Sequence, residues 1–298
     1  MDFRDLVKNK NVLITTFNHF NHNTISDQTE FVYNGIKDIT NVRIEKTLTP
    51  CNVLIIIEYF DDFLISKLKN FLVDKDIEIY VILTEHMDLV GKKFYFHGDD
   101  ILNKSDYMDS RDKITRICGL LSISPYVSGF LRLFDLPELT NFNHIINNSN
   151  IYNLHSNSII NNYKNRKKGY DFLFYGKITV YRRKILNELN NNFKIKIVAD
   201  FIKNDELQIL SDNSLFVLSI PQNEDWKWSS PMRVIKSLKM GVPVLSISNK
   251  LKGKISDIIL NLSINEADFV NLLRKSLLNS EKIFISQLID FNKLCNEK

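Results

Sequence analysis

The segment from residue 171 to residue 249 decides the fold. It begins with DFLFYGK (171–177) and closes with SSPMRVIKSLKMGVPVLSIS (229–248). Two further apolar runs, 194–199 and 215–220, lie between these ends, and helical patterns separate the four runs. The order is therefore strand, helix, strand, helix, strand, helix, strand. This alternation predicts a parallel sheet covered by helices on both faces.

Polar residues gather at one predicted edge of this sheet. In such sheets, ligands bind outside the carboxyl ends of the strands. The residues that fall at or beside this edge are Gly176, Lys177, Arg182, Arg183, Gln222, Ser229, Ser230 and Arg233. Ser230 is expected to cap the helix that begins at Pro231. Cations, hydroxyls and a helix N-terminus together predict a site for a phosphate-bearing ligand.

The two adjacent arginines are not expected to act together. Arg182 and Arg183 would point about 100° apart on a helix, so only one of them is expected to reach the ligand. Gly241 is expected to end the next helix with a positive φ angle.

These motifs resemble the donor half of the GT-B glycosyltransferases. The resemblance rests on a strand followed by Gly-x-x-x-x-x-Arg (176–182), on Ser-Pro-x-Arg (230–233) and on Gly-Val-Pro-Val (241–244). It implies a C-terminal Rossmann-like domain that binds a nucleotide-sugar. Many members carry a Glu in the helix after the Ser-Pro turn, where it holds the donor ribose, but this sequence has Lys236 there.

The predicted fold class is α/β, with two Rossmann-like domains facing a central cleft. A chain of 298 residues is long enough for two domains. We expect an acceptor domain over 1–156, a polar and basic linker over 157–169 and a donor domain over 170–280. The resemblance implies that the final helix, 281–298, packs back on the first domain.

The first half also alternates strands and helices. Strands are predicted at 10–16, 52–58, 77–84, 93–97 and 151–154, and helices at 27–38, 61–72, 106–121 and 127–134. Glu85 and His86 directly follow the clearest of these strands, and His19 follows the first one. Because sugar transfer to a hydroxyl needs a base or a carboxylate near the reacting centre, these three are the candidate catalytic residues.

Composition narrows the class of protein. Hydrophobic residues make up 44% and charged residues 25% of the chain, as in soluble globular proteins. The three cysteines are far apart and form no metal-binding spacing, so no metal is expected. No signal peptide or apolar span is evident, which predicts a cytoplasmic protein, with a peripheral position at the inner membrane face as the alternative. There is no GxGxxG motif and no P-loop, so redox and ATPase functions are not indicated.

The predicted function is metal-independent transfer of a sugar from a nucleotide-activated donor to a hydroxyl acceptor. No cofactor is expected beyond this co-substrate. By analogy with the family, the acceptor is a glycan or a lipid-linked precursor of a bacterial surface polysaccharide, and nucleic acid is not the expected partner. Two alternatives stay open: a DNA-modifying glucosyltransferase of the same fold, and a non-catalytic protein that binds a nucleotide-sugar or glycan.

Overall fold

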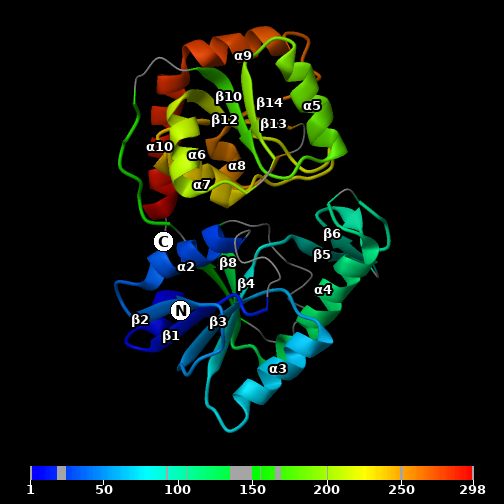
Figure 1. The fold of residues 1–298 in the computed structure, drawn as a ribbon, viewed down its shortest axis with the longest axis vertical. Helices are drawn as coiled ribbons and strands as arrows, with labels where there is room; N and C mark the ends of the chain where they lie inside the picture. The colour runs from blue at the N-terminus through cyan, green and yellow to red at the C-terminus, as the bar shows by residue number, and fades with distance from the viewer. Residues whose placement is uncertain are drawn as a thin grey trace. The chain divides into compact units, whose positions relative to one another are not determined.

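The computed structural model describes residues 2–18, 25–91, 93–105, 107–134, 150–154, 156–164, 169–199, 201–248 and 251–296. The chain forms two compact units, Met1–Ser156 and Asn157–Lys298. Figure 1 shows each unit as a sheet with helices packed against it. The described helices include none that is long and apolar enough to cross a bilayer.

The first unit is built on a six-stranded parallel sheet. In spatial order its strands are β2 (Asn41–Glu45), β1 (Asn11–Thr15), β3 (Val53–Ile57), β4 (Glu78–Leu83), β8 (Gly129–Leu133) and β9 (Asn150–Leu154). All five residues of β3 are buried, which explains its uninterrupted apolar sequence. β2 has a mostly polar, half-exposed sequence and lies at the sheet edge.

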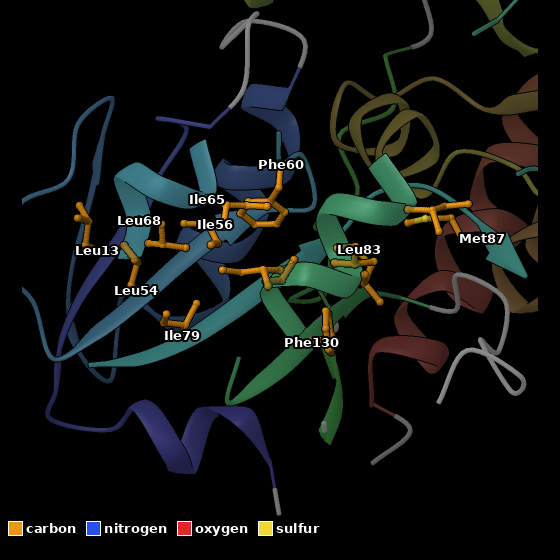
Figure 2. Packing of buried hydrophobic residues seen from close by; sticks show 14 of the residues in the cluster. Leu13, Leu54, Ile56, Phe60, Ile65, Leu68, Ile79, Leu83, Met87 and Phe130 are labelled. Carbon is orange, nitrogen blue, oxygen red and sulfur yellow. The ribbon is translucent and has the colours of Figure 1, made fainter. Parts of the chain in front are cut away.

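Helices and a small antiparallel sheet complete this unit. The helices are α1 (Phe3–Val7), α2 (Ser26–Ile36), α3 (Asp62–Leu72) and α4 (Ser110–Ile123), followed by the 3-10 turn η2 (Ser124–Tyr126). The antiparallel strands are β5 (Met87–Val90), β6 (Lys93–Phe96) and β7 (Asp99–Asp100). Figure 2 shows residues of the core, with Leu54, Ile56 and Ile79 of the sheet close to Ile65 and Leu68 of α3.

The helix expected at 127–134 is wrong, because this segment contains strand β8. The strand pairs with β4 on one side and β9 on the other, and four of its five residues are buried. A short apolar run that is buried on both faces cannot be distinguished from a buried helix by periodicity. Gly129 permits this packing, because a Cβ atom there would lie 2.6 Å from the ring of Tyr152.

The second unit has a five-stranded parallel sheet. Its spatial order is β11 (Ile195–Val198), β10 (Tyr170–Tyr175), β12 (Ser214–Ser219), β13 (Val244–Ile247) and β14 (Leu260–Leu262). Its helices are α5 (Val180–Asn190), α6 (Asn204–Asp212), α7 (Pro231–Lys239), α8 (Lys254–Ile258), α9 (Phe269–Leu278) and α10 (Ser280–Asn296). The alternation predicted for 171–249 is confirmed, and the two-domain Rossmann-like class with it.

The last helix is part of the second unit. The Gln287 side chain on α10 donates to the carbonyl of Val244 and accepts from its N–H, at 2.7 and 2.9 Å. The expectation that this helix also packs on the first unit stays a prediction. The described part of the expected linker, 157–164, also packs on the second unit, where Asn292 of α10 bonds the backbone of Ile159.

Candidate functional site

The second sheet has a topological switch point between β10 and β12. The chain leaves β10 to form β11 on one side and then returns to form β12 on the other. The carboxyl ends of β10 and β12, at Tyr175 and Ser219, therefore lie at the position where such sheets bind ligands.

A glycine turn follows β10 at this point. Gly176 has a φ of +124°, and a Cβ atom there would lie 3.0 Å from Nη2 of Arg233. Arg233 Nη2 in turn donates to the carbonyl of Tyr175 at 3.1 Å. A residue with a side chain would be strained in this backbone conformation, and its Cβ atom would crowd the guanidinium group, so glycine is the residue that fits this position.

Arg233 is a half-buried cation with unused hydrogen-bonding capacity. Its Nε atom is buried and has no hydrogen-bond partner. Within the described residues, no carboxylate pairs with it, and its close neighbours include the rings of Phe174 and Tyr175, at 5.8 and 5.4 Å. Burial lowers the pKa of Arg233 from its ordinary value. A group in this state gains most from an anionic partner, since a buried charge without one is costly.

Arg182 and Arg183 have different environments, as their spacing predicts. Arg182 is 5% exposed and donates to the carbonyls of Ile220 and Lys177, at 2.8 and 2.7 Å. It thus ties the end of β12 to the turn after β10. Arg183 is exposed on α5, and Lys177 is exposed in the turn. Which of these cations contacts a ligand stays a prediction.

The N-terminus of α7 completes this edge. Ser230 occupies the N-cap position, but its side chain makes no capping hydrogen bond, contrary to expectation. The buried Ser229 hydroxyl lies 3.0 Å from that of Ser219 on β12. Gln222 accepts a 2.6 Å bond from Thr179 Oγ1 through its carbonyl, while its Oε1 atom is buried without a partner. The structure thus brings Gly176, Gln222 and Arg233 to the carboxyl edge of the second sheet. Two buried side-chain atoms at this edge, Gln222 Oε1 and Arg233 Nε, have no hydrogen-bond partner.

In the first unit, Glu85 is the centre of a buried ion-pair cluster. Its Oε2 lies 2.6 Å from His97 Nε2, and its Oε1 accepts from Arg116 Nη1 at 3.1 Å and from the Tyr107 hydroxyl. His97 has a φ of +54°, which is unusual for a residue with a side chain. Glu58, at the end of β3, contacts Thr84 through both carboxyl oxygens, and Arg116 Nη1 lies 3.9 Å away.

The two carboxyl groups of this cluster have opposite pKa shifts. Burial alone would raise the pKa of Glu85, but the hydrogen bond and charge of His97, together with Arg116 and Tyr107, lower it to about 2. Burial, and then the charge of Glu85, raise the pKa of Glu58 to about 8. Glu85 is therefore ionised at neutral pH with both oxygens engaged, an arrangement that favours an ordering role over proton abstraction.

The catalytic roles assigned to Glu85, His86 and His19 stay predictions. His86 is 5% exposed, and its carbonyl accepts from the N–H of His97 at 2.8 Å. His19 lies outside the described residues. In the described part of the chain, no group of three or more His, Cys, Asp or Glu residues is placed to hold a metal ion.

The sequence analysis missed Arg116 and Tyr107. Arg116 could have been found, because it falls on the apolar stripe of its helix beside Ile117 and Leu120, where a charged residue needs a buried partner. Tyr107 precedes that helix in a polar segment and carries no comparable signal.

The chain was compared with known proteins. No protein-family profile matches it, and no curated protein sequence matches it. Among solved structures, T4 phage BGT in complex with its UDP-glucose substrate is similar, with a TM-score of 0.52 and 14% identity, over 96% of this chain and 95% of that one. Sucrose-phosphate synthase from Thermosynechococcus elongatus has a TM-score of 0.51 and 10% identity, over 82% and 69%.

A structure of TarM is similar at a lower TM-score of 0.45, with 12% identity over 83% of this chain and 51% of that one. The chain thus spans about half the length of TarM and nearly the whole length of T4 BGT. The likenesses to T4 BGT and to sucrose-phosphate synthase show that the chain has the fold of the GT-B glycosyltransferases.

Proposed function

We propose that this protein transfers a sugar from a nucleotide-activated donor to a hydroxyl acceptor. The observation that carries the proposal is the half-buried Arg233 guanidinium group, which lies beside the glycine turn at the switch point, has a buried Nε atom without a hydrogen-bond partner, and has no acidic partner among the described residues. A donor diphosphate would supply that partner.

The proposed site holds the donor by its phosphates. Arg233, the N–H groups at the start of α7 and the turn at Gly176 would contact the phosphate oxygens. As the bond to the sugar breaks, negative charge grows on the leaving phosphate, and the fixed cation stabilises it. In the first unit, the buried Glu85 would order the end of β4, and His86 or His19 would accept the acceptor proton.

The acceptor is proposed to be a glycan or a lipid-linked sugar of a bacterial surface polymer. Residues 1–156 contain 16 Lys and Arg against 21 Asp and Glu, whereas residues 157–298 contain 23 against 14. An excess of acid in the proposed acceptor unit disfavours a polyanionic acceptor, because DNA binding depends on neutralising phosphates. A lipid-linked acceptor would bring the protein to a membrane surface, and vesicle flotation tests that contact.

A DNA acceptor is the second candidate. One observation favours it: T4 BGT, described as a DNA-modifying enzyme, matches over nearly the full length of both chains. Transfer of radiolabelled sugar to duplex DNA with hydroxyl-bearing bases, compared with transfer to polyprenol-linked and polysaccharide acceptors, decides between the two.

The donor site is tested by thermal unfolding with UDP-, GDP-, CMP- and dTDP-sugars and the free nucleotides, with UDP-glucose first. A ligand at about 100 times its Kd should stabilise the folded protein by about 2.7 kcal/mol and raise Tm by roughly 5 °C or more. Arg233→Ala should weaken binding about 10–100-fold. Arg274→Ala, which removes an exposed arginine of α9, is the matched control and should leave the shift intact. If no nucleotide shifts Tm, the donor site is refuted.

Turnover is measured separately from binding. Release of free nucleotide from the donor that binds, with and without acceptor, would confirm an enzyme. A donor that binds through Arg233 without any turnover would instead establish a non-catalytic binding protein.

A further inference from the structure

An open groove lies beside the edge strand of the second sheet, and one of its lining residues, Val198, accepts a hydrogen bond from the N–H of Gly176. It runs along the edge strand β11 and the helix α6, and its volume is about 380 Å³. The residues that line it are Lys196, Val198, Phe201, Ile202, Glu206, Ile209 and Leu210. Among the described strands, β11 pairs only with β10, so it forms one edge of this sheet.

Large apolar side chains project beside this groove. Phe201 is 62% exposed and Ile209 is 68% exposed, and both line the groove. The helix α6 buries Leu207 against the sheet, whereas Ile209 lies on its outer side. Burying one such side chain completely stabilises a complex by about 1.5–3 kcal/mol, so the surface favours an apolar partner.

The groove also carries one charge of each sign. Lys196 and Glu206 both line it, and neither has an ion-pair partner among the residues that the structure describes. A face with apolar projections, an apolar hollow and two opposite charges is complementary to itself. An isologous two-fold interface requires such a surface, in which each group of one copy meets its complement on the other.

We propose that a second copy of this chain docks on this face, with α6 packed against α6 around a two-fold axis. Ile209 of one copy enters the hollow formed by Val198, Ile202 and Leu210 of the other. Lys196 of each copy pairs with Glu206 of the other. An anionic lipid surface fits less well, because Asp205 and Glu206 offset the charges of Lys196 and Lys203 and leave these residues without a net positive charge. The surface is small, so the dimer is weak and depends on concentration.

Sedimentation velocity of the full chain over about 1–200 µM, which spans the weak range, tests the proposal. The wild type should shift from monomer to dimer. Lys196→Glu should be monomeric because two glutamates then face each other, and Glu206→Lys should be monomeric because two lysines do. Both positions lie on the surface, and circular dichroism checks that each variant is folded.

The decisive sample is an equal mixture of the two single variants. In the mixed dimer both contacts become Lys opposite Glu, so dimers should re-form although each variant alone is monomeric. Glu188→Lys, an exposed acid of α5, is the matched control and should dimerise like the wild type. Three results would overturn the proposal. They are a monomeric wild type, two charge-reversal variants that both still dimerise, and an equal mixture of the variants that stays monomeric. Binding to anionic vesicles by a monomeric wild type, lost in Phe201→Ser, would assign the face to lipid instead. None of these outcomes depends on the donor site.

Discussion

Replacing Glu58 by Gln is predicted to change how stability depends on pH. Burial and the charge of Glu85 raise the pKa of Glu58 from an ordinary 4.5 to about 8. Between these pH values the folded state holds one proton more than the unfolded state. The stabilisation is therefore complete below pH 4.5 and is lost as pH rises towards 8. From pH 6 to pH 8 the loss for this group is about 2 kcal/mol.

Gln at position 58 keeps the shape of the protonated side chain, and it can accept from the Thr84 N–H and donate to the Thr84 hydroxyl. The variant should therefore match the wild type below pH 4.5, exceed it by about 2 kcal/mol near pH 6 and exceed it by about 4 kcal/mol near pH 8, because it has no proton to lose.

The assay is urea unfolding followed by far-UV circular dichroism at pH 6 and pH 8. Trp226 and Trp228 both lie in the second unit, so tryptophan fluorescence reports that unit and should show no effect of the substitution. Glu30→Gln, an exposed acid of α2, is the control and should follow the wild type at both pH values. If Glu58→Gln loses as much stability as the wild type between pH 6 and pH 8, Glu58 is already ionised in the folded protein and the reasoning is refuted.

Three further predictions concern stability. Arg182→Leu should destabilise the second unit by roughly 2–4 kcal/mol, because the carbonyl groups of Ile220 and Lys177 lose their buried donor. Chemical unfolding followed by tryptophan fluorescence measures the loss of stability, and an unchanged unfolding midpoint would contradict the prediction. Gly241→Ala should destabilise the second unit by roughly 1–3 kcal/mol, because the φ angle of Gly241 is +76° and a Cβ atom there would lie 2.6 Å from the carbonyl oxygen of Asn162. The same denaturant titration tests this prediction, and an unchanged stability would show that the turn can relax. The pKa of Glu85 is held near 2, chiefly by His97, so the ionised carboxylate stabilises the folded state above pH 4.5 and this stabilisation is lost as pH falls towards 2. Glu85→Gln should therefore be less stable than the wild type near neutral pH, and its free energy of unfolding should depend less on pH between 4.5 and 2. An unchanged acid transition would show that Glu85 does not make these interactions.

Most elements of the second unit could be predicted because they have strong local signals, whereas the short α8 and β14 were not predicted. Its first strands are short apolar runs, and Gly176, Gly241 and Pro243 mark the turns between them. The first unit was harder. β2 is half-exposed and polar, so it has no apolar run, and β8 has an apolar pattern that suits a helix equally well.

The sheet edge that holds the candidate site could be predicted from topology. Which side chains bond to the protein and which are available to a ligand could not. Arg182 and Arg233 are of the same residue type and both follow a predicted turn. Arg182 bonds a carbonyl 38 positions away, at Ile220, and this pairing follows from the strand order rather than from any local pattern. The burial that separates a structural arginine from an available one is likewise a property of the folded chain.

The bond between Arg233 and the Tyr175 carbonyl has a kinetic consequence. An arginine side chain that is free in solution loses up to about 2 kcal/mol of rotamer entropy when it is immobilised. Arg233 is already immobilised by folding, so an anion that arrives at this edge meets a guanidinium group in its final orientation. In the proposed donor site, capture of the diphosphate would then need no side-chain search, and the rate of association would be governed by diffusion and by ionic strength instead of by local rearrangement.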